Sequence, residues 1–196
     1  TMVYGILELI NFAHGEVTMV GAMVALTVIG VLVGVAPDLP GVLIVLGGIL
    51  VAIPACMALA FGIEKVAYRP LRRAPRLAPL ITAIGVSIVL QNLAMLIWGR
   101  QYISFPPLLP RVGFEFFGAH VTLLQIVIVV LAVTIMAGLW QLVERTRLGR
   151  AMRATAQSKE VAELMGVNVD RVISATFIIG AAIAAIAGVM VSAYYG

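Results

Sequence analysis

The chain has 196 residues, of which 62% are hydrophobic and only 11% are charged, and its mean hydropathy is +1.12. These values exclude an ordinary water-soluble domain, which could not cover its surface with so few polar groups. The net charge of +4 does not indicate nucleic-acid binding, since the basic residues flank apolar runs. The one cysteine, Cys56, has no partner for a disulfide, and no metal site is expected.

Apolar stretches of about 20 residues predict helices that cross a membrane. Five stretches have this length, at residues 17–35, 41–63, 77–98, 121–143 and 172–195. A sixth stretch, residues 1–10, reads as the tail of a span that begins before Thr1. We therefore expect an all-α, polytopic transmembrane helix bundle that forms a single domain over residues 1–196 and is a fragment of a larger protein, truncated at both ends.

Most of the 13 lysine and arginine residues lie in two segments between these spans, 64–76 and 144–171. Loops rich in lysine and arginine stay on the cytoplasmic side of a membrane. This rule places both segments inside the cell. It places the turn at 36–40 and the segment 99–120 outside.

The sequence Asn-Phe-Ala-His-Gly-Glu at 11–16 interrupts an otherwise apolar stretch near the start of the chain. Ionisable groups at membrane depth usually face a water-filled path or a partner helix. Asn11, His14 and Glu16 are therefore candidates for a broken helix that lines a substrate path. The alternative is a simple cytoplasmic turn, with Glu16 exposed at the start of the next helix.

A second polar group lies inside the predicted span 77–98. Ser87 and Gln91 are four residues apart and share one helical face, and Asn92 follows them. Such side chains either form hydrogen bonds with neighbouring helices or line a translocation path. The sequence leaves both interpretations open.

Small residues recur at a spacing of four in two of the predicted spans, at Gly180, Ala184 and Gly188 and at Gly30 and Gly34. Helices in lipid associate through close backbone contact, which small side chains permit. We expect both sets to mark tightly packed helix faces.

The second basic segment contains a predicted short helix at residues 158–165. Its apolar side carries Val161, Leu164 and Met165. Gly166 is suited to end this helix, because glycine tolerates the left-handed conformation past a helix end. The segment is either a basic loop that rests on anionic headgroups or a short helix that enters a groove of a partner.

Four motifs appear along the chain in a specific order and spacing. They are Asn-Phe-Ala-His-Gly-Glu at 11–16, Glu-Lys-Val-Ala-Tyr-Arg-Pro at 64–70, Ala-Ile-Gly-Val-Ser-Ile-Val-Leu-Gln-Asn at 83–92, and Gly-Arg-Ala-Met-Arg-Ala at 149–154 with Met-Gly at 165–166. Together they resemble the permease subunit of branched-chain amino acid ABC importers, the LivH type. The resemblance implies a permease domain of the bacterial inner membrane that is not an enzyme, needs no cofactor and hydrolyses no ATP itself.

The resemblance also implies partners: two ATP-binding subunits, a second related permease, a periplasmic substrate-binding protein and the lipid bilayer, but no nucleic acid. Closure of the ATP-binding subunits would swing the bundle between inward and outward openings, and so carry branched-chain amino acids or related small polar solutes across the membrane. The residues expected to couple to the ATPases are Arg150, Arg153, Ala154, Lys159, Glu163, Leu164, Met165 and Gly166. The residues expected to line the substrate pathway are Asn11, His14, Glu16, Ser87, Gln91 and Asn92.

Two other functional classes are compatible with a membrane bundle. A secondary transporter or a channel would use the same spans without an ATPase, and the long basic segment 144–171 argues against it. An intramembrane hydrolase would need a nucleophile and a base, for which only Ser87 and His14 qualify. These two residues lie in different spans and outside any recognisable catalytic motif, so we expect no catalytic residue.

Overall fold

The computed structural model describes residues 13–71, 74–75, 77–101, 103–108, 113–116 and 119–195. Residues 1–10, predicted to be part of a span, and Asn11 lie outside the described residues. Within the described ranges, five helices are long and apolar enough to cross a membrane, which confirms the predicted all-α bundle. They are α2 (Ala13–Val35), α3 (Gly41–Ile63), α4 (Leu77–Trp98), α5 (Leu123–Arg145) and α8 (Val169–Tyr195).

The ends of these helices follow local signals. The bounds of α3 and α4 coincide with the predicted spans, whereas α2 begins earlier than predicted because His14 and Glu16 continue the helix. Helix α5 begins later than predicted, since the Thr122 amide donates to the Gln125 side chain in a capping box. A π-helical turn η1 (Glu64–Tyr68) and a 3-10 turn η2 (Arg69–Leu71) extend α3.

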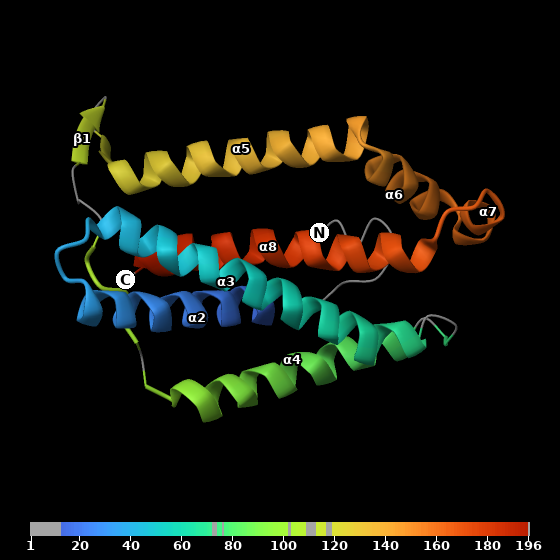
Figure 1. Ribbon diagram of the computed structural model, residues 1–196, viewed down its shortest axis with the longest axis horizontal. Helices are drawn as coiled ribbons and strands as arrows, with labels where there is room; N and C mark the ends of the chain where they lie inside the picture. The colour runs from blue at the N-terminus through green and yellow to red at the C-terminus, as the bar shows by residue number, and fades with distance from the viewer. Residues whose placement is uncertain are drawn as a thin grey trace.

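Helices α2, α3 and α8 pack together at the centre of the bundle (Figure 1). A Cβ atom at Gly188 of α8 would overlap the Thr18 carbonyl oxygen of α2, and one at Gly21 would lie 2.8 Å from Ala185 Cα. Glycine at both positions therefore lets the α2 and α8 backbones touch, as the small-residue pattern predicted for Gly188. The expectation for Gly30 and Gly34 was wrong within the described chain, because a Cβ at either would meet nothing within 4 Å.

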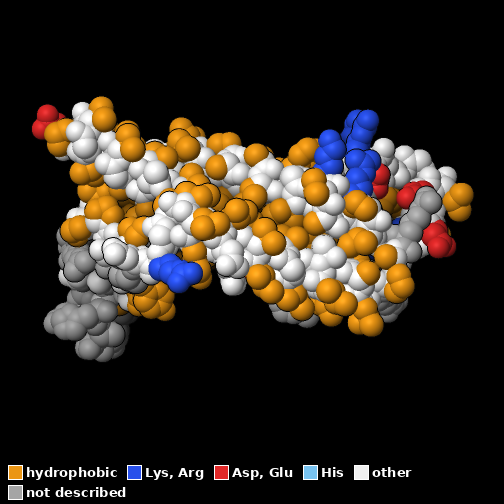
Figure 2. All heavy atoms as spheres, turned by 90° about the horizontal axis from the view of Figure 1, so that it is seen from below, with side chains coloured by type: hydrophobic (Ala, Val, Ile, Leu, Met, Phe, Trp, Pro, Cys, Tyr) orange, Lys and Arg blue, Asp and Glu red, His pale blue; other side chains and the backbone are white. Residues whose placement is uncertain are grey.

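Helices α4 and α5 lie at the outside of the bundle. No residue of α5 is buried, and an apolar groove of about 620 Å³ separates α5 from α8. Figure 2 shows hydrophobic side chains along the length of the molecule, with charged side chains mainly toward the end that carries α6 (Arg147–Gln157) and α7 (Lys159–Leu164). An apolar flank with charged ends is the distribution that a membrane-spanning bundle requires.

The two ends of the bundle differ in structure. At one end, hereafter the α7 end, α3 turns into α4 and α5 leads through α6 and α7 into α8, so both basic segments lie there (Figure 1). The opposite end holds the turn at 36–40 and an unpredicted antiparallel hairpin of β1 (Gly113–Phe116) and β2 (Ala119–Thr122). Because the hairpin is short and peripheral, it leaves the all-α class unchanged.

Candidate functional site

A carboxylate of α2 joins two polar side chains of α4. Glu16 Oε1 accepts a hydrogen bond from Ser87 Oγ at 2.9 Å and another from Gln91 Nε2 at 2.7 Å. We call these three residues the α2–α4 contact. Ser87 and Gln91 reach the same atom because they lie one helical turn apart on one face of α4.

The α2–α4 contact lies near the middle of the bundle's long axis. Ser87 and Gln91 belong to the central part of α4, and the thiol of Cys56, in the middle of α3, donates to the Val17 carbonyl at 3.6 Å. Figure 1 shows that α2 begins part-way along α3 and α8 and not at the α7 end. Of the two interpretations of the motif at 11–16, this geometry favours polar groups at membrane depth over a turn at the membrane surface.

The other predicted pathway residues lie apart from this contact. The His14 ring faces α8, where a Cβ at Gly180 would lie 4.0 Å from His14 Cε1. Asn92 donates to the Ile88 carbonyl of its own helix at 2.8 Å, and its side chain is exposed. Asn11 lies outside the described residues. The structure thus brings together three of the six residues, and two others in α2 and α4 face elsewhere.

Sequence reasoning missed a second link between α2 and α4. Trp98 Nε1 donates to Thr27 Oγ1 at 2.8 Å, near the end of the bundle opposite α7. A tryptophan as the last residue of an apolar span was the available signal, since its N–H needs an acceptor when the ring lies in an apolar environment.

At the α7 end, the predicted short helix is present, and its bounds, Lys159–Leu164, lie one residue inside the predicted 158–165 at each end. The Ser158 hydroxyl accepts from the Val161 amide at 3.3 Å and caps the start of α7. Gly166, with φ of 83°, ends the helix. Its backbone amide donates a hydrogen bond to the Glu163 carbonyl, and the Val167 amide donates one to the Ala162 carbonyl. This pair of bonds is a Schellman motif, so the prediction that Gly166 stops the helix is confirmed.

The apolar side of α7 faces away from the bundle. Leu164 is 85% exposed, Met165 81% and Val161 57%, whereas Ala162 is buried against the neighbouring helices. Arg150 on α6 and Lys159 and Glu163 on α7 are also exposed. The α7 tip therefore presents apolar side chains surrounded by charge of both signs.

Two of the predicted coupling residues, Arg153 and Ala154, contact other residues of this chain. Arg153 donates to the Val143 carbonyl at the end of α5 and forms an ion pair with Glu144 at 3.5 Å. Ala154 packs against the buried cluster around Met152. Both residues thus hold α6 against the bundle. Neither is as exposed to solvent as Leu164.

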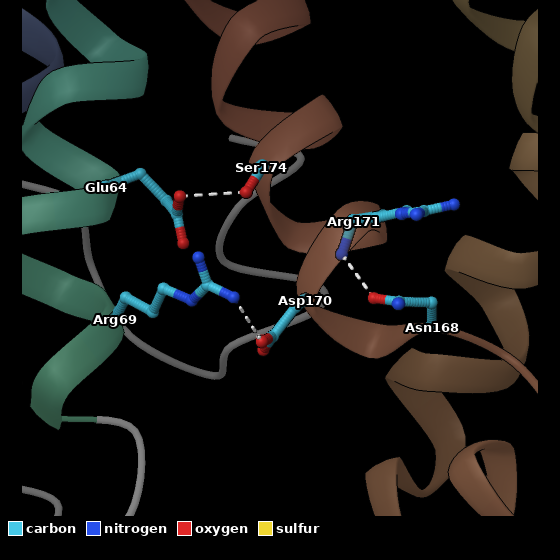
Figure 3. A network of polar contacts seen from close by, with 6 residues as sticks. All are labelled: Glu64, Arg69, Asn168, Asp170, Arg171 and Ser174. Carbon is cyan, nitrogen blue, oxygen red and sulfur yellow. Dashed lines mark hydrogen bonds and ion pairs between the residues drawn. The ribbon is translucent and has the colours of Figure 1, made fainter.

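A network of polar side chains joins the end of α3 to the start of α8 (Figure 3). Ser174 Oγ donates to Glu64 Oε2 at 2.8 Å, and Arg69 pairs with Asp170 at 2.9 Å. Glu64 is 1% exposed, and Figure 3 shows the Arg69 guanidinium between the Glu64 and Asp170 carboxylates. Asn168 Oδ1 caps α8 by accepting from the Arg171 amide at 3.0 Å. We call these six residues the α3–α8 network.

Sequence reasoning placed Glu64 and Arg69 in the motif at 64–70 but predicted no role for either residue. A glutamate directly after an apolar span is costly unless it finds a partner, and this was the signal available. No group of three or more metal-ligating side chains occurs among the residues that the structure describes.

Comparison with known proteins identifies the family. All of residues 1–196 match the family model described as "Branched-chain amino acid transport system / permease component". The chain belongs to this permease family. As a member of this family with five long apolar helices among its described residues, it is a multi-pass membrane protein.

Individual relatives also carry the names of branched-chain amino acid permeases. The chain is 45% identical over 200 residues to the high-affinity branched-chain amino acid transport system permease protein LivH of Escherichia coli K12, and 44% identical over 202 residues to BraD of Pseudomonas aeruginosa. A probable LivH of Methanocaldococcus jannaschii is 28% identical over 188 residues, which are 96% of this chain and 58% of that protein. The first two matches cover 100% of this chain and 65% of the relative, so the chain spans 65% of their length. No solved structure matches the permease chain.

Proposed function

We propose that this permease is the membrane-spanning subunit of an ATP-binding cassette importer, which moves branched-chain amino acids or related small polar solutes across the inner membrane by alternating access. The observation that carries the proposal is the exposed apolar side of α7, where Leu164 and Met165 project from an otherwise charged end of the bundle. A short helix that exposes large apolar side chains fits a groove on a partner protein. The names of the LivH and BraD relatives supply the solute class.

In this proposal the α7 end faces the cytoplasm, because both basic segments lie there. Helix α7 enters a cleft on one of two ATP-binding subunits, and Arg150, Lys159 and Glu163 meet charges around that cleft. Arg153 and Ala154 contribute indirectly, by fixing α6 to the bundle. A second related permease and a periplasmic substrate-binding protein complete the importer.

The proposed substrate pathway passes the α2–α4 contact. A carboxylate, a hydroxyl and an amide meet near mid-height of a bundle whose helices are otherwise apolar. Intramembrane ionisable groups are rare, face the bundle interior or a water-filled cavity, and mark substrate and ion paths. In alternating access, α2 and α4 would part on one side of this contact and then on the other.

Leu164→Asp in the full-length protein tests the docking of α7. We expect it to reduce the ATP-hydrolysing subunit that co-purifies in detergent by about tenfold or more, because a charge in the centre of an apolar contact costs about 2 kcal/mol or more. Leu164 is exposed, so folding should not change. Gln157→Asp is the matched control, since it adds the same charge to an exposed site at the end of α6, before α7 begins.

Three results are informative. Loss of the ATPase from Leu164→Asp but not from Gln157→Asp supports an ABC importer that couples through α7. Equal recovery with both variants contradicts docking at α7. Absence of any ATPase from the wild-type protein would favour the alternative, a secondary transporter or a channel for small solutes.

A further inference from the structure

We propose that Glu16 binds the ammonium group of the amino-acid substrate midway along its path, using the carboxylate oxygen that faces neither Ser87 nor Gln91. This inference rests on the proposed function, because it assumes that an amino acid passes the α2–α4 contact. Beyond the proposed function, it names the atom of this chain that recognises the substrate ammonium group.

The hydrogen bonds of Glu16 are unevenly distributed. Ser87 and Gln91 both donate to Oε1, and no residue that the structure describes donates to Oε2. An ionised carboxylate has room for about four hydrogen bonds, shared between its two oxygens. Glu16 therefore retains acceptor capacity on the oxygen that its protein partners leave free.

The charge of Glu16 is also unmatched within the described chain. Its two donors are neutral, and no lysine or arginine of the described residues forms an ion pair with it. The His14 ring lies beside Gly180 of α8 and forms no ion pair with Glu16. Elsewhere, Asp170 pairs with Arg69 and Glu144 with Arg153. An uncompensated carboxylate at membrane depth is costly, and a passing cation would lower that cost.

The surroundings allow a small solute to approach. Glu16 and Ser87 are half-buried, and Gln91 is exposed. Gln91 and Ser87 hold Oε1 toward α4, which orients the carboxylate before any ligand arrives. A substrate ammonium would form a charge-assisted hydrogen bond with Oε2, and such bonds are about twice as strong as neutral ones.

The first test measures transport in proteoliposomes that contain the full-length protein with its partner subunits and binding protein. For Glu16→Gln we expect leucine uptake per ATP hydrolysed to fall by about tenfold or more, while the binding protein still stimulates ATP hydrolysis. Glu16→Asp should retain part of the uptake, since it keeps a carboxylate. Asp38→Asn, which removes a charge from the exposed turn between α2 and α3, should behave as wild type.

The second test measures thermal unfolding of the purified full-length protein and does not depend on an ATPase. Leucine and 3-methylbutylamine, which carry an ammonium group, should raise the unfolding temperature of the wild type but not of Glu16→Gln. The anion 4-methylpentanoate has the same carbon skeleton as leucine without the ammonium group, and it should have no effect.

Several results would overturn the inference. One is uptake per ATP by Glu16→Gln within about twofold of wild type. Another is loss of stimulated ATP hydrolysis together with uptake, which would give Glu16 a structural role. The inference would also be refuted if 4-methylpentanoate or sodium chloride raised the unfolding temperature as much as 3-methylbutylamine does. If the wild type shows no ATP-dependent uptake, the proposed function fails, and the unfolding test still decides whether Glu16 binds an ammonium group.

Discussion

The α2–α4 contact and the α3–α8 network each join helices that are far apart in the chain through a glutamate. Glu16 accepts only neutral donors on one oxygen, whereas Glu64 is fully buried, bonded to Ser174 and accompanied by Arg69 (Figure 3). The carboxylate at the α7 end thus lies within a closed set of protein partners. The carboxylate at mid-height does not. This difference fits a stabilising role for the α3–α8 network and supports our proposal that the α2–α4 contact binds a ligand.

The largest effect should come from the helix packing that positions Glu16. In Gly188→Ala, the new Cβ atom overlaps the Thr18 carbonyl oxygen of α2, two residues from Glu16, and overpacking of this kind costs up to about 3 kcal/mol. We expect a lower free energy of unfolding in detergent and lower uptake, with the α3–α8 network intact. Gly180→Ala is the matched control, because its Cβ would meet nothing closer than 4.0 Å. Equal effects of the two variants would contradict close packing at Gly188.

The next effect compares the two glutamates directly. Glu64→Ala should lower the free energy of unfolding by about 2 kcal/mol, because it removes a buried carboxylate and leaves the half-buried Ser174 hydroxyl without its acceptor. Glu16→Ala should cost about 1 kcal/mol, since hydrogen bonds between membrane helices average about 0.6 kcal/mol each. Denaturation of both variants of the full-length protein, beside their uptake per ATP, checks this ranking. A larger loss of stability at Glu16 than at Glu64 would reverse the comparison.

The smallest effect concerns the ion pair of the α3–α8 network. Arg69 and Asp170 have side chains 50% and 47% exposed, so their coupling should be about 1 kcal/mol or less. A double-mutant cycle of Arg69→Ala and Asp170→Ala measures this coupling, and raised salt should weaken it. A coupling of several kcal/mol would show that this pair, and not the Glu64–Ser174 bond, dominates the network.

The sequence by itself determined the helical class, the five spans within the described residues and the end of α7. Continuous apolar runs of about 20 residues permit little besides a membrane helix, and Gly166 ends α7 by a local backbone preference that any tertiary context would respect. The clustering of basic residues also predicted correctly that two segments would share one end of the bundle.

Only the tertiary structure decided which polar groups meet. The motif at 11–16 left open whether Glu16 lies at a surface turn or at membrane depth, and nothing local pairs it with Ser87 or Gln91. Likewise, nothing local shows that Arg153, predicted as a coupling charge, also donates to the Val143 carbonyl. The physical reason is that such pairings depend on the rotation and height of each helix. Backbone contacts at Gly21 and Gly188 set both for α2, and apolar periodicity does not encode them.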